Sequence, residues 1–97
     1  MDEKEKVREQ LDALDTAEQA LTGEDPGTDF TRNQIERLIS GLLLRLTALV
    51  TSGNPPAALS AADQASLVNA MATLNSAVTQ SAGAVQILQA ATALASA

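Results

Sequence analysis

Two short segments that contain glycine and proline divide this sequence into three longer stretches with helical periodicity. Residues 23–29 contain two glycines and a proline, and residues 53–56 read Gly-Asn-Pro-Pro. Proline has no backbone N–H and its ring clashes with the preceding helical turn, so it is disfavoured inside a helix. The chain is therefore expected to turn at both places. We predict an all-α fold class, an up-down-up three-helix bundle formed by residues 1–97 as one domain.

The first predicted helix covers residues 2–22. Its apolar residues recur at spacings of four, three and seven, which places them on one face: Val7, Leu11, Leu14 and Leu21. Acidic residues at its beginning suit the positive end of the helix dipole. Gly23 follows as the expected glycine just past the helix end. Because this helix is acidic, we expect it to face solvent and to supply solubility.

The second predicted helix covers residues 32–52, after a loop at 23–31. Thr31 and Gln34 match a capping box, and Phe30 and Ile35 match a hydrophobic staple around it. The apolar face of this helix is wide enough to touch two neighbouring helices; it consists of Ile35, Leu38, Ile39, Leu42, Leu43, Leu46, Leu49 and Val50. We therefore expect this helix to be the central element of the fold.

The third predicted helix covers residues 61–95, after a loop at 53–60 that Gly53 opens. Ser60 and Asp63 give it an S-x-x-D start signal. At ~1.5 Å per residue it would extend roughly 50 Å, against roughly 30 Å for each of the other two. Either this longer helix overhangs its partners, or it breaks near Gly83 into two pieces.

A heptad pattern favours continuity of the third helix. Apolar residues alternate at spacings of four and three if Ser81 fills one position, and an alanine stands before every second member. Such a stripe is typical of coiled coils and tight bundles. We predict it to be a protein interface, formed by Leu67, Met71, Leu74, Val78, Val85, Leu88, Ala70, Ala77, Ala84 and Ala91.

Charge is distributed very unevenly along the chain. All six basic residues and eleven of the twelve acidic residues precede residue 46, and Asp63 is the sole charged side chain after Arg45. Solvent-facing helices usually carry charges. An uncharged third helix therefore indicates a surface that another helical protein, or a second copy of this chain, covers. A general compositional bias toward alanine is the alternative explanation.

The composition argues against most catalytic and ligand-binding functions. His and Cys are absent, which removes the common general base, the thiol nucleophile and the usual transition-metal ligands. We therefore expect no enzyme activity, no metal, no cofactor and no small-molecule substrate. The six basic residues are scattered and form no stripe for phosphates, so nucleic-acid binding is not expected. Glu36, Arg37 and Arg45 interrupt the leucine-rich stretch, so we expect no membrane span.

The shortage of large side chains gives a further reason to expect association. Phe30 is the sole aromatic residue in 97 residues, and alanine buries little apolar area, so a small single chain gains little from its own core. We predict a non-enzymatic interaction or self-assembly module that forms a larger helical bundle, with a homo-oligomer as the simplest form. Two alternatives stay open: a small acidic regulator or inhibitor of a target protein, and a helical chaperone or adaptor for an export substrate.

The beginning of the sequence carries no signal for secretion. Residues 1–8 are mostly charged and no apolar segment of the kind found in signal peptides follows them. We expect a cytoplasmic protein, with export that needs no such signal as the open alternative.

Overall fold

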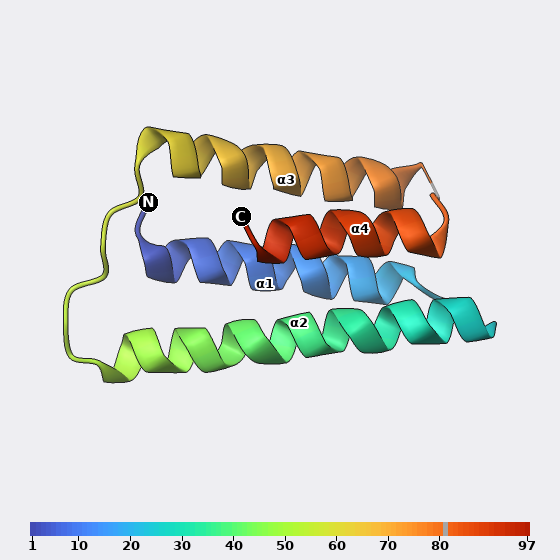
Figure 1. The fold of residues 1–97 in the computed structure, drawn as a ribbon, viewed down its shortest axis with the longest axis horizontal. Helices are drawn as coiled ribbons and strands as arrows, with labels where there is room; N and C mark the ends of the chain where they lie inside the picture. Colours follow the sequence, from blue (N-terminus) through green and yellow to red (C-terminus); the bar gives the residue numbers. More distant parts are fainter. Residues whose placement is uncertain (81) are drawn as a thin grey trace.

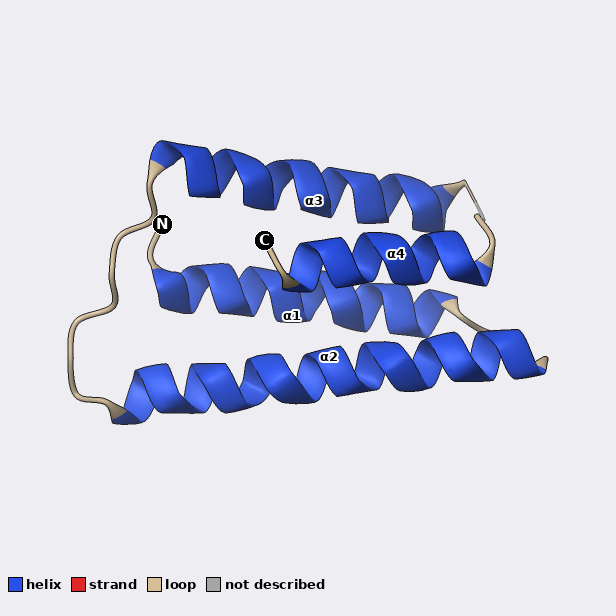
Figure 2. Cartoon of the chain, viewed as in Figure 1, coloured by secondary structure: helices blue, strands red, loops and turns tan. Residues whose placement is uncertain are grey.

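In a computed structural model of the chain, which describes residues 1–80 and 82–97, the described residues form four α-helices and no strand (Figures 1 and 2). The helices are α1 (Glu3–Ala20), α2 (Pro26–Thr51), α3 (Ala61–Thr79) and α4 (Ala84–Ala95). An isolated antiparallel bridge joins Asp2 to Ala58. The all-α prediction is confirmed, but the described residues form four helices where we expected three.

The helices lie roughly side by side, with α1 and α4 between α2 and α3 (Figure 1). Helix α1 packs against all three other helices, whereas α2 and α3 make no contact within the described part of the chain. The prediction that the second helix is central is therefore wrong. Its wide apolar face does touch two neighbours, α1 and α4, as the sequence indicated.

Helix α1 is also less exposed than its charge suggested. Val7, Leu14 and Ala17 are almost completely buried, and the amide of Gln10 lies among them. The Gln10 Nε2 group donates a hydrogen bond to the Leu94 carbonyl at 2.8 Å and ties α1 to the end of α4. The acidic residues occupy mainly the opposite face. Helix α1 thus combines a charged outer face with the most extensively contacted inner face of the fold.

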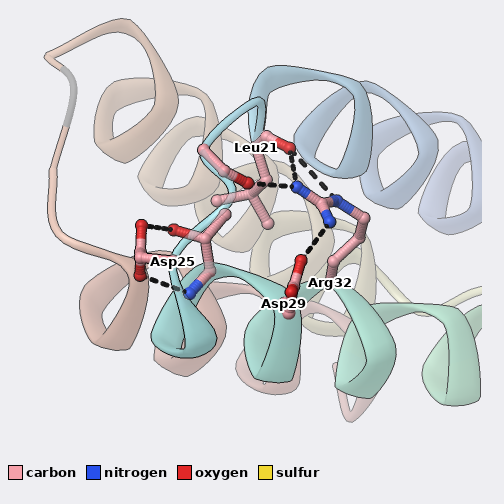
Figure 3. Close-up of polar contacts among 6 residues, drawn as sticks. Leu21, Asp25, Asp29 and Arg32 are labelled. Carbon is pink, nitrogen blue, oxygen red and sulfur yellow. Dashed lines mark hydrogen bonds and ion pairs between the residues drawn. The ribbon is translucent and has the colours of Figure 1, made fainter.

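Helix α2 begins six residues before its predicted start. Its N-cap is Asp25, whose carboxylate accepts hydrogen bonds from the Thr28 backbone N–H at 2.9 Å and the Thr28 hydroxyl at 2.7 Å (Figure 3). Pro26 takes the first helical position, where a missing N–H is harmless and the fixed φ angle suits a helix. The capping box at Thr31 is therefore wrong: Thr31 is buried within the helix, and Phe30 is 58% exposed.

The turn between α1 and α2 is held by Arg32 (Figure 3). Its guanidinium donates to the Leu21 carbonyl through Nε at 3.1 Å and Nη2 at 2.6 Å, and to the Gly23 carbonyl at 2.8 Å. Nη1 pairs with the Asp29 carboxylate at 2.7 Å. A cation here complements the negative end of the α1 dipole. It also bonds two carbonyls that accept no backbone hydrogen bond within the described part of the chain.

Gly23 does not end α1 as predicted, because the helix already stops at Ala20. The residue instead lies close to the N-cap of α2, where there is little space for a side chain. A Cβ atom at this position would lie 3.0 Å from the Asp25 carboxylate and 3.1 Å from the Thr28 hydroxyl, closer than such atoms normally approach. Gly53 does have the predicted role, since its φ angle of 73° reverses the chain after α2.

The third predicted helix is two helices. The Ser60 hydroxyl caps α3 as predicted, accepting from the Asp63 N–H at 3.1 Å. Helix α3 then ends at Thr79, and α4 begins at Ala84 and runs back along α3 (Figure 1). The alternative of a break near Gly83 is thus the observed one. Ser81, which the heptad pattern needed, lies outside the described residues. Folding back lets the apolar face of α4 pack on α1, α2 and α3 instead of overhanging them.

Candidate protein-binding groove

A groove of about 430 Å³ runs between α1 and α3. The α1 wall is formed by Glu9, Asp12, Ala13, Thr16 and Ala17, and the α3 wall by Met71, Ala72, Leu74, Asn75 and Val78. Each wall covers about two helical turns, or roughly 10–12 Å at 1.5 Å per residue. The two helices run in the same direction along it (Figure 1).

The floor of the groove is apolar and its rim is polar. Leu74 and Ala17 are buried at the bottom, and Ala13, Met71 and Val78 are partly exposed above them. The exposed rim carries two carboxylates on α1, those of Glu9 and Asp12. The other exposed rim residues are uncharged: Thr16, Ala72 and Asn75. A concave apolar surface with a few polar groups at its edge is the usual form of a binding site.

The structure brings three of the predicted interface residues into this groove, namely Met71, Leu74 and Val78. Leu74 is only 2% exposed, so Met71 and Val78 are the members that a partner can reach. Their spacing of one heptad places them on the same side of α3, two turns apart. Three residues of the predicted stripe thus line the α3 wall of the groove, and their contact with a partner stays a prediction.

Other predicted members on α3 are already covered by the chain itself. Leu67 is fully buried in the core, and Ala70 and Ala77 are partly buried against it. In this conformation Leu67 cannot contact a partner. The two alanines of the stripe on α3, Ala70 and Ala77, therefore pack within the chain's own fold, and only part of each remains accessible.

The predicted members on α4 are displaced by the break after α3. Val85 was expected at the interface with the stripe, but it is 68% exposed and outside the groove, whereas Ile87, which the heptad omitted, is 5% exposed. Ala84 and Leu88 are partly buried, and Ala91 is fully buried. A helix that restarts at Ala84 no longer follows the register of α3. The spacing of Ile87, Ala90, Ala91 and Leu94 is itself the signal of a separate apolar face.

The outward face of α3 is exposed and almost uncharged. Asn69, Thr73, Ser76 and Thr79 all face solvent, and so does Val68, which is 55% exposed. The charge asymmetry of the sequence therefore corresponds to a spatial asymmetry. Charged side chains are concentrated on α1 and α2, and Asp63 is the sole charge on α3 and α4.

A second apolar surface lies on the C-terminal half of α2. Leu43 is 50% exposed, Leu44 74% and Val50 54%. Helix α4 has only 12 residues against 26 in α2, so it runs beside only part of α2 (Figure 1).

Two carboxyl groups outside the groove have shifted pKa values. Partial burial raises the pKa of Glu18, and the nearby carboxylates of Glu36 and Asp15 raise it further, against a smaller opposing effect of Arg32. The hydrogen bonds from Thr28 lower the pKa of Asp25, as expected for a helix N-cap. Both shifts belong to helix ends and helix contacts, so they have structural causes.

Within the described residues, no three His, Cys, Asp or Glu side chains are grouped so that they could hold a metal ion. None of the described helices has an apolar stretch long enough to cross a membrane. Comparison of the chain with protein-family models, with curated proteins and with solved structures finds no match. The groove and its chemistry are therefore the basis for a functional proposal.

Proposed function

We propose that this protein is a non-enzymatic protein–protein interaction module that binds a helix of its partner in the groove between α1 and α3. The observation that carries the proposal is the groove itself, with an apolar floor that includes Met71 and Val78. The adjoining face of α3 is exposed and nearly free of charge. Both features favour contact with another protein over permanent exposure to water.

The proposed mechanism is the docking of an amphipathic helix by its apolar face. Such helices present side chains at positions i, i+4 and i+7 to a groove. That repeat covers roughly 10 Å along a helix, which matches the length of the groove walls. One anchor would contact Met71, a second would lie above Leu74, and the third would contact Val78. Small residues along the rim, such as Ala72, allow the backbones to approach closely.

The experiment uses a neutral amphipathic peptide and nuclear magnetic resonance of the isotope-labelled full chain. The peptide has about 14 residues, or roughly four helical turns, with leucine on one face and glutamine and alanine on the other. We expect chemical-shift changes in the groove walls, near Ala13, Met71 and Val78. The exchange Ala72→Gln, at the exposed rim, should weaken these changes, whereas the matched exchange Ala48→Gln on the exposed side of α2 should not.

Two results would contradict the proposal. One is the absence of any shift at peptide concentrations at which the peptide itself is helical and monomeric. The other is a set of shifts confined to α2, with Ala72→Gln behaving like the original chain. In either case the groove would not be the binding surface.

Self-association is the second candidate function, and the exposed leucines of α2 favour it. Leu43, Leu44 and Val50 form an apolar surface outside the groove, which a second copy would cover in a larger helical bundle. Light scattering across concentration measures this directly. A molar mass that rises with concentration, and that Leu44→Lys returns to 10.0 kDa, supports it. A constant 10.0 kDa at every concentration contradicts it.

A further inference from the structure

The groove between α1 and α3 has a negative charge with no compensating cation in its walls. Glu9 and Asp12 are exposed on the α1 wall, and no Lys or Arg lines the groove. Neither carboxylate takes part in an ion pair within the residues that the structure describes. The apolar floor lies directly beside them.

The basic residues for which the structure gives a role serve other parts of the fold. Arg32 binds the carbonyls at the end of α1, and Arg45 lies 3.9 Å from the Glu3 carboxylate. Lys6, near the start of α1, is 8% exposed, so most of its side chain is buried. The α3 wall brings no charge of either sign to the groove. Arg8 is exposed and precedes Glu9 on α1, but it is not among the residues that line the groove, so the charged groups of the groove walls are the two α1 carboxylates.

We propose that the occupant of the groove is a basic amphipathic helix of a different protein. Its apolar side chains would lie on Ala13, Met71 and Val78, and its lysines or arginines would pair with Glu9 and Asp12. This inference rests on the proposed function and adds the charge of the partner to it. Charge complementarity of this kind selects a partner and its register more than it increases affinity.

A second copy of this chain does not meet the requirement. Helices α3 and α4 contain no basic residue, and α1 carries more acidic than basic side chains. Helix α2 has three arginines, but Arg32 binds the carbonyls at the end of α1 and Arg45 lies 3.9 Å from the Glu3 carboxylate. Within the described residues this leaves Arg37, next to the acidic Glu36, as the one α2 cation for two groove carboxylates. A two-fold symmetric pairing through the groove would also place the same surface of both copies together. It would bring Glu9 and Asp12 of one copy toward those of the other, and like charges repel. The groove is therefore suited to a partner that supplies the cations.

The test compares three synthetic helices that share one leucine face. Their polar faces carry lysine, glutamine or glutamate, and each peptide ends in a tryptophan. The chain itself has no Trp or Tyr, so the fluorescence of the peptide reports binding without interference. We expect the lysine peptide to bind roughly fivefold more tightly than the glutamine peptide in dilute salt, as two exposed ion pairs allow. The glutamate peptide should bind more weakly than both.

Two double variants identify the groups responsible. Glu9→Gln with Asp12→Asn should remove the preference for the lysine peptide over the glutamine peptide. Glu24→Gln with Asp63→Asn makes the same change in net charge at exposed positions outside the groove, and it should retain the preference. Raising the salt concentration should reduce the preference in the original chain, since exposed ion pairs are screened.

The outcomes separate this inference from the function on which it rests. Equal binding of the lysine and glutamine peptides overturns the inference while the groove remains a helix-binding site. A lysine preference that survives Glu9→Gln with Asp12→Asn also overturns it, because net charge alone would then explain the effect. If none of the peptides binds, the proposed function itself fails.

Discussion

Replacement of Arg32 by methionine should destabilise the fold by about 2 kcal/mol. The guanidinium makes three hydrogen bonds to the carbonyls of Leu21 and Gly23 and one ion pair with Asp29. A hydrogen bond to a charged group contributes about 1.5–3 kcal/mol. These carbonyls can bind water when Arg32 is removed, and an exposed ion pair adds less than about 1 kcal/mol. The total is therefore well below the sum of the separate bonds.

Urea unfolding followed by far-ultraviolet circular dichroism measures the change, since the protein is helical. Arg37→Met is the matched control, because Arg37 is exposed and makes no ion pair within the described part of the chain. It should change the free energy of unfolding by less than about 0.5 kcal/mol. Arg32→Lys keeps the charge but not the planar fork of donors, so it should restore only part of the loss. Equal stabilities of the Arg32→Met and Arg37→Met variants would refute this reasoning.

Three further predictions concern the core and one charged contact. Leu74→Ala should lower the free energy of unfolding by about 3 kcal/mol, because Leu74 is buried. Val85→Ala should lower it by less than about 0.5 kcal/mol, because Val85 is exposed on α4. Similar urea midpoints for the two variants would contradict the break between α3 and α4. Gln10→Leu should change the free energy of unfolding by less than about 1 kcal/mol. The reason is that Gln10 Oε1 is buried without a hydrogen-bond partner among the described residues, and that the Leu94 carbonyl keeps another donor. A loss above about 3 kcal/mol in thermal unfolding would contradict this. Since the pKa of Glu18 is raised, its ionisation weakens folding as pH rises through that pKa. Glu18→Gln should therefore stabilise the protein at pH 7 and have no such effect below about pH 4, where the carboxyl group is protonated. Unfolding curves that show the same gain at both pH values would contradict this assignment.

The helices were predictable where local signals act alone. The Ser60 cap involves only residues at the start of α3, and it was predicted correctly from the sequence. The start of α2 shows how a correct rule can mislead, since proline ends one helix and also begins another. Asp25 before Pro26 is the signal that decides between the two. If Pro26 is interpreted only as a helix breaker, the predicted start moves to residue 32, with Thr31 as its cap.

The order of the helices in space was not predictable in the same way. The sequence shows that α1 has an apolar face, but not how many neighbours cover it. The width of the α2 face indicated two contacts for that helix correctly and suggested a central place that α1 takes instead. Two structures were compatible with the sequence after Thr79: one continuous helix that keeps the heptad pattern, and two helices of which α4 folds back and becomes buried. Burial on three helices prevails because a continuous helix would leave Ile87 and Leu94 without partners.

The groove was predictable in part. Met71 and Val78 belong to the heptad stripe that the sequence singled out, and both lie in the groove. The opposite wall was missed, because Glu9 and Asp12 looked like solvated charges on an ordinary helix face. Only the packing of α1 beside α3 places these carboxylates next to an apolar floor. That relation depends on tertiary structure and has no signal in the local sequence.

Nuclear Overhauser effects between the protein and the bound lysine peptide locate the binding surface most directly. With the methyl groups of both molecules labelled separately, we expect contacts from the peptide leucines to the Met71 and Val78 methyl groups. No contact should reach Leu44 on α2 or Val85 on α4. Contacts to Leu44 or Val85 in the absence of contacts to Met71 would show that the groove between α1 and α3 is not the site at which this protein binds its partner.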